Sequence, residues 1–137
     1  MLASLALNDD STIVIAGAGV IAVVLTAMTA HAGNADVQEM GCAVLANLAD
    51  NDENQILIAG AGGIGVVLTA MTTHTGNEFH EYGCEALGNL GQSDVTLQKR
   101  IKDEGGVGVV EVAVGAVGAT AGCKKYGQTL LDTLASV

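Results

Sequence analysis

Apolar residues recur along this chain at the spacing of an α-helix. One apolar stripe ends before Gly33-Asn34 and another before Gly76-Asn77, so each predicts a helix that ends at a polar loop. The positions i, i+3, i+4 and i+7 are Ile21, Val24, Leu25 and Met28 in the first stripe and Ile64, Val67, Leu68 and Met71 in the second.

Each of these helices is followed by another amphipathic stripe. These later stripes comprise Val37, Met40, Val44, Leu45 and Leu48 in one case and Phe79, Tyr82, Ala86, Leu87 and Leu90 in the other. A short helix is predicted from about residue 53 to residue 61, after the polar loop 50–52, and Gly62-Gly63 then predicts a sharp turn. The chain is therefore built from units of three helices, which predicts an all-α fold.

These units are repeats. Residues 15–34 and 58–77 are identical at 16 of 20 positions at a spacing of 43, and residues 40–49 correspond to 82–91 at a spacing of 42. A weaker copy covers residues 101–135, in which Gly115, Gly118 and Gly122 predict an irregular stretch over 113–122. We divide the single domain 1–137 into a partial third helix (1–8), two repeats (9–50 and 51–92) and a degenerate repeat (93–137).

The unit resembles the armadillo repeat. The residues that carry the resemblance are Ile58, Gly63-Ile64, Val67-Leu68, Val37-Gln38 and the run 43–49, AVLANLA. The resemblance covers nearly the whole chain and keeps its register from copy to copy. It implies a right-handed α-solenoid of about three three-helix repeats. It also implies a protein- or peptide-binding scaffold whose third helices line a concave groove.

The resemblance also implies which residues face that groove. In the armadillo family an Asn on each third helix hydrogen-bonds the backbone of an extended peptide, and this position falls on Asn47 and Asn89. The remaining groove candidates are Glu39, Ala43, Glu81, Glu85 and Thr133, with Thr133 at the Asn position of the last unit. No Trp precedes these positions as in the importin-α branch, which disfavours that branch's way of recognising nuclear-localisation peptides. The alternative is that both Asn side chains face solvent or cap local backbone.

Charge favours a basic partner. The net charge is −10, and residues 1–98 hold eleven acids and no Lys or Arg. A nucleic-acid surface is normally basic, so we expect no nucleic-acid partner. An acidic groove attracts a Lys- or Arg-bearing segment. The alternative is that the acids only keep an apolar chain in solution.

Two glycine motifs imitate a dinucleotide fingerprint. They are Gly17-x-Gly19-x-x-Ala22 and Gly60-x-Gly62-x-x-Gly65, each after an apolar run. A Rossmann-like nucleotide-binding protein is therefore a minor alternative. The fingerprint needs a second parallel strand after its helix, whereas residues 35–49 predict another helix. We read the glycines as turns between first and second helices, and we expect no cofactor.

No metal or catalytic set is visible. Asp50-x-Asp52-x-Asn54 begins like a calcium loop but has Gln55 where Gly is needed and Ala61 where Glu is needed. His80 and Cys84 lie one turn apart but supply only two ligands. His31 and His74 end second helices, where a cation interacts favourably with the helix dipole. We therefore expect no metal, no catalytic residues and no enzymatic activity.

The remaining features concern setting and assembly. Three cysteines form no disulfide framework, and the chain shows neither a signal peptide nor about 18 uninterrupted apolar residues. These features predict a cytoplasmic protein without a membrane partner, with the nucleus as an alternative. The rival to a binding scaffold is a structural or self-associating repeat, including a synthetic one, that associates through its exposed ends.

Overall fold

The computed structural model describes residues 10–92 and 94–137. Its helices are α2 (Asp10–Ala30), α3 (Ala35–Leu48), α4 (Asp52–Gly60), α5 (Gly63–Thr73), α6 (Asn77–Leu90), α7 (Val95–Asp103), α8 (Gly106–Gly115) and α9 (Ala121–Leu134). These two ranges contain no strand. The predicted all-α class is confirmed, whereas the partial helix predicted at 1–8 lies outside the described residues.

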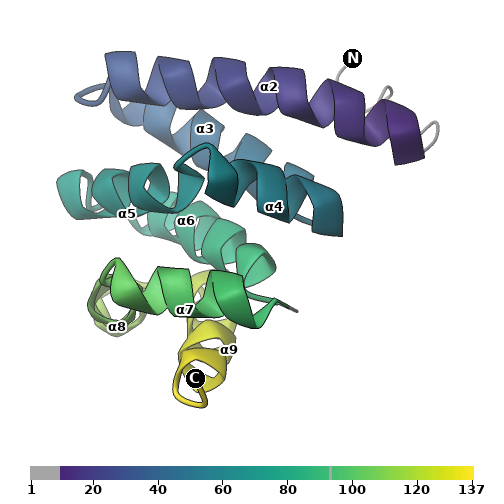
Figure 1. Cartoon of the computed structure of the whole chain (residues 1–137). Coiled ribbons are helices and arrows are strands. Elements are labelled where there is room, and N and C mark those ends of the chain that lie inside the picture. The colour runs from purple at the N-terminus through teal and green to yellow at the C-terminus, as the bar shows by residue number, and fades with distance from the viewer. Residues whose placement is uncertain (1–9, 93) are drawn as a thin grey trace.

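The helices are stacked in layers that follow the order of the sequence (Figure 1). Helices α2 and α3 form the first layer, α4 to α6 the second and α7 to α9 the third. Helix α6 lies between α3 and α9 and makes its most extensive contacts with these two. In the described residues no single helix is long and apolar enough to cross a membrane, and only the bent pair α4–α5 reaches that length and composition together.

Two glycine pairs bend the chain between first and second helices, as the sequence predicts. Gly62 and Gly105 have φ values of +88° and +92°, a left-handed conformation that favours Gly. The next residue in each pair has no room for a side chain, because a Cβ on Gly63 would lie 2.8 Å from the carbonyl oxygen of Ile58. The axes of α4 and α5 consequently meet at 74°.

The first unit departs from this pattern. Helix α2 runs without a break from Asp10 to Ala30, so the turn predicted at its glycine motif is wrong. Val20 occupies the place that Gly63 holds in the next unit. Because that place excludes even a Cβ, a valine there prevents the tight turn, and the first and second helices continue as one. Within residues 10–50 the unit therefore has two helices instead of three.

Second and third helices approach closely through a second set of glycines. The side chain of Met71 lies where a Cβ on Gly83 would stand, with its Cγ 2.7 Å from that position. Met28 packs in the same way on Gly41 in the first layer. The second helix can therefore pack closely on the backbone of α3 and of α6, and Val114 occupies the same place at Gly127 of α9.

Candidate functional site

The predicted groove residues lie on the three adjacent third helices. Asn47 is exposed on α3, whereas Asn89 on α6 and Thr133 on α9 are half-buried. The other predicted residues, Glu39, Ala43, Glu81 and Glu85, are half-buried as well. The structure thus brings the predicted set onto neighbouring elements.

The two Asn side chains differ in what they do. The Nδ2 of Asn89 donates a hydrogen bond of 2.9 Å to the carbonyl oxygen of Ala46, in the preceding third helix. Asn89 therefore ties α6 to α3, which the sequence did not indicate. The exposed Asn47 leaves its amide facing outward. Thr133 donates to the carbonyl oxygen of Thr129 within its own helix, 3.0 Å away.

Carboxylates gather where α3 and α6 meet. Burial raises the pKa of Glu85 above its usual value, and the negative charges of Glu81 and Asp50 raise it further. Sequence reasoning missed Asp50, because it follows the end of α3 and lies one residue outside the helical stripe. The signal that could have found it is its position three residues after Asn47.

Glu81 is held in place by the next layer. Its Oε1 accepts a hydrogen bond from the hydroxyl of Thr120, 2.5 Å away. Thr120 is also the N-cap of α9, where its oxygen accepts from the backbone N–H of Cys123 at 3.0 Å. A Cβ on Gly122 would lie 2.5 Å from the Glu81 carboxyl carbon, so a glycine there makes room for the acid. Glu81 is thus fixed rather than free to move with a ligand.

Among the described residues, none of these acids forms an ion pair with a Lys, Arg or His side chain. The ion pair among the described residues joins Arg100 and Glu104 at 3.8 Å, and both belong to the end of α7. Glu39 lies instead beside a hollow of about 360 Å³ between α3 and the start of α6. That hollow is also lined by Glu78 and His74. The surface of α3 and α6 is therefore negative and holds no ion pair in the described part of the chain, whereas α9 carries the exposed Lys124 and Lys125 near its start.

The cysteines are buried and free. Desolvation raises the pKa of Cys42 to about 12, and burial followed by the charge of Cys123 raises that of Cys84. The sulfur atoms of Cys84 and Cys123 lie 3.8 Å apart. Nowhere in residues 10–92 and 94–137 do three His, Cys, Asp or Glu side chains gather as a metal site would need.

Two of the three histidines, His74 and His80, hydrogen-bond backbone carbonyl groups. The buried His80 donates from Nε2 to the carbonyl oxygens of Met71 and His74, at 3.2 and 3.0 Å. His74 donates from Nε2 to Ala32 in the first layer, at 2.9 Å. His80 is therefore a helix-end cap instead of half of a zinc pair with Cys84.

The two glycine motifs that imitate a dinucleotide-binding fingerprint lie within or between helices. Gly17 and Gly19 lie inside α2, and Gly62 forms the turn between α4 and α5. Because the described residues contain no strand, the parallel sheet that a dinucleotide fingerprint serves is lacking in them.

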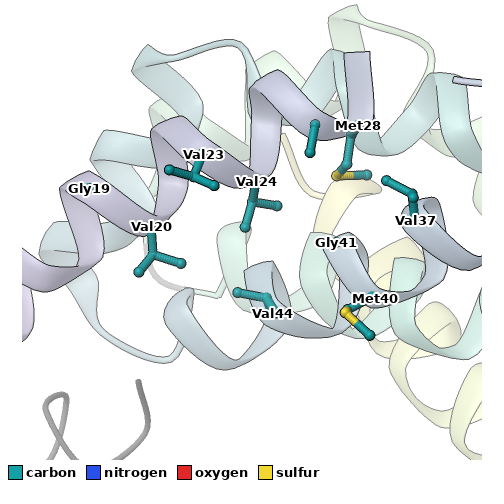
Figure 2. A pocket seen from close by; sticks show the side chains of 10 residues that line it. Gly19, Val20, Val23, Val24, Met28, Val37, Met40, Gly41 and Val44 are labelled. Atoms are coloured by element: carbon teal, nitrogen blue, oxygen red, sulfur yellow. The ribbon is translucent and has the colours of Figure 1, made fainter. Parts of the chain in front are cut away.

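A hollow that sequence reasoning missed opens on the outer face of the first layer. It is an almost wholly apolar groove of about 530 Å³ between α2 and α3. Figure 2 shows valines from both helices pointing into it, with Met40 at its edge. Val20, Val24 and Val44 line the hollow, and Met28 and Gly41 close one end.

Comparison with known proteins identifies a similar structure but no family. No protein-family model matches the chain, and no curated protein matches it. A crystal structure of an engineered protein from the Northeast Structural Genomics Consortium superimposes with a TM-score of 0.79 at 29% identity. The match covers 98% of this chain and 53% of the other, so this chain spans about half the length of that protein.

Proposed function

We propose that the chain is an armadillo-type α-solenoid that binds an extended segment rich in Lys or Arg along α3, α6 and α9. Three repeated features support the armadillo assignment: the Gly-Gly turns after α4 and α7, the Met-on-Gly contacts between second and third helices, and the contiguous third helices. Such stacking generates the curved surface on which solenoids bind partners.

The observation that carries the proposal is the cluster of Asp50, Glu81 and Glu85. Burial raises the pKa of Glu85, and the like charges of Glu81 and Asp50 raise it further. A Lys or Arg side chain placed among them relieves that repulsion and gains charge-assisted hydrogen bonds. The exposed Asn47 on the neighbouring helix supplies an amide for the backbone of the same segment.

Fluorescence polarisation with labelled Lys/Arg-containing peptides tests this proposal. Glu85→Gln keeps the size of the side chain and removes its charge, so affinity should fall by about tenfold, the value of one charged hydrogen bond. Glu53→Gln makes the same substitution at an exposed residue of α4 and should leave affinity unchanged. Equal affinity of the parent chain and Glu85→Gln would contradict the proposal.

Asn47→Ala examines the backbone contact separately. It removes an exposed amide, so folding should be unaffected while peptide affinity falls several-fold. Asn89→Ala is a poorer choice, because it also breaks the hydrogen bond to Ala46. If Asn47→Ala binds peptide as the parent chain does, the Asn has no role in binding.

A structural, self-associating role is the second candidate. One comparison fits the synthetic form of this alternative, since the similar structure is that of an engineered protein. In either role we propose that the chain has no catalytic activity. Its three buried free thiols fit a reducing, cytoplasmic setting.

A further inference from the structure

The outer face of the first layer is apolar, and none of the residues 10–92 and 94–137 covers it. Val23 on α2 and Met40 on α3 expose 69% and 71% of their surface at the groove shown in Figure 2. No charged side chain lines this groove. Contiguous apolar surface of this kind marks interaction sites in proteins.

The same positions are covered in the other two layers. Val24 is half-buried, whereas its counterparts Val67 and Val110 are fully buried. Val37 is also half-buried, whereas its counterparts Phe79 and Cys123 are buried. Ala27 is half-buried as well, whereas its counterparts Ala70 and Ala113 are buried. In each later layer these residues are covered by the layer before it. The groove on α2 and α3 is therefore half of a layer-to-layer interface.

The opposite end of the stack is built differently. Glu111, Gln128 and Asp132 are exposed there, and their counterparts in the earlier layers are Leu68, Cys84 and Gly88. Gln128 donates to Asp132 across one helical turn, at 3.0 Å. Polar side chains thus occupy positions that bury apolar contacts in the layers before, so this end is capped.

We propose that a second copy of the chain covers the α2–α3 face, with its own α2–α3 face, about a two-fold axis. A head-to-tail contact would instead bury Glu111 and Asp132 of one copy in the apolar groove of the other, without partners. An isologous contact buries apolar against apolar surface and closes at two copies. This interface shares α3 with the proposed peptide site but uses different residues of that helix, because Met40 and Val44 line the groove whereas Asn47 belongs to the peptide site.

Charge sets how this association responds to salt. Each copy has a net charge of −10, so two copies repel each other. The contacting groove itself has no charged lining. Added salt screens the repulsion and leaves the apolar contact intact, so the dimer should become tighter as the salt concentration rises.

Sedimentation equilibrium on the full chain, from about 1 to 100 µM, tests the proposal. We expect a concentration-dependent monomer–dimer equilibrium. Val23→Glu, at an exposed position, should raise the dissociation constant by at least about tenfold because it buries a charge in the contact. Val112→Glu is the matched control, since Val112 on α8 is 70% exposed and lies outside this face. Circular dichroism checks that both variants keep the parent helicity.

Four results would overturn the two-fold dimer. They are a monomer at every concentration, open-ended polymers, a dimer that Val112→Glu dissociates as well as Val23→Glu does, and a dimer that salt weakens. Peptide binding by the Val23→Glu monomer reports on the proposed peptide site independently, so failure of one proposal is distinguishable from failure of the other.

Discussion

Buried amide side chains hold the ends of helices in this fold. Gln55 donates to the carbonyl oxygen of Ala49 at 2.8 Å, and Gln98 repeats the contact with Gly91 at 2.8 Å. Gln38 caps the end of α2, donating to Met28 and His31 at 3.0 and 2.9 Å. The carbonyl groups of Met28, Ala49 and Gly91 lie at helix ends, so the side chains satisfy groups that burial would otherwise leave unpaired. The carbonyl oxygen of His31 also accepts from the backbone N–H of Asn34, 2.9 Å away.

Removing one of these buried glutamine side chains should lower the stability of the fold. Gln55→Ala leaves the carbonyl group of Ala49 buried without its donor, so we expect the free energy of unfolding to fall by about 1–3 kcal/mol. Gln128→Ala removes an exposed hydrogen bond to Asp132 and should change stability by less than about 0.5 kcal/mol. Urea denaturation measures both, and equal effects of the two substitutions would show that the buried cap is not special.

Glu85 should make stability depend on pH in the direction opposite to most carboxylates. Its raised pKa means that the folded state binds the proton more tightly than the unfolded state does. Its stabilising contribution is therefore full below the unfolded pKa and is lost as the pH rises through the folded pKa. Glu85→Gln should raise the melting temperature near neutral pH and have little effect below the usual carboxyl pKa. Glu111→Gln, at an exposed site, is the control, and no gain near neutrality would contradict the prediction.

At the scale of elements, the helices could be predicted where the apolar periodicity and the positions of the glycines indicate the same helix boundaries. The stripes of α5 and α6 and the turn at Gly62-Gly63 follow from the sequence, because apolar spacing and left-handed glycine conformations are local properties. The continuity of α2 was not predicted. It depends on one residue, Val20, whose effect is visible only once the contact between Gly63 and Ile58 is known.

The candidate site was less predictable than the helices. The resemblance placed Asn89 on a third helix, but its bond to Ala46 depends on a neighbour 43 residues away. The same holds for the contact of Thr120 with Glu81 and for the charge of Asp50 near Glu85. Distances between layers decide these interactions, and a pattern along one chain does not contain them.

Substitutions at the Gly62-Gly63 turn test whether the close contact between Gly63 and Ile58 limits which residues the turn accepts. Gly63→Ala introduces a Cβ 2.8 Å from the carbonyl oxygen of Ile58, so we expect a loss of about 1–3 kcal/mol of stability. Gly60→Ala, three residues earlier, meets nothing within 4 Å at the end of α4 and should be neutral or stabilising by up to about 1 kcal/mol. Thermal melts compare the two, and a tolerated Gly63→Ala would mean that the turn relaxes easily.

For the whole molecule, position in the stack decides how firmly a helix is held. Helix α5 contacts α2 in the layer before and α8 in the layer after. Among the described residues, helix α8 contacts the layer before it through α5 and α6 and no further layer. It contains Gly108 in its interior, ends at Gly115 and exposes Val112 and Glu111. The chain then runs without helix to Ala121, within the stretch that the glycine pattern marks as irregular.

Amide hydrogen exchange should therefore be faster in α8 than in the equivalent helix α5. Local opening of α8 exposes less apolar surface than opening of α5, so its amides should exchange at least about tenfold faster, a difference of about 1.4 kcal/mol. Gly108→Ala should reduce the difference in exchange rate between α8 and α5. A Cβ at this position meets no atom within 4 Å, and Ala favours helix over Gly by about 0.5–1 kcal/mol. Ala70 and Ala113 occupy matching buried positions and give a direct comparison of one amide in each helix. Equal protection at these two amides would show that the end layer is held as firmly as the middle one, and that the stack opens as a single cooperative unit.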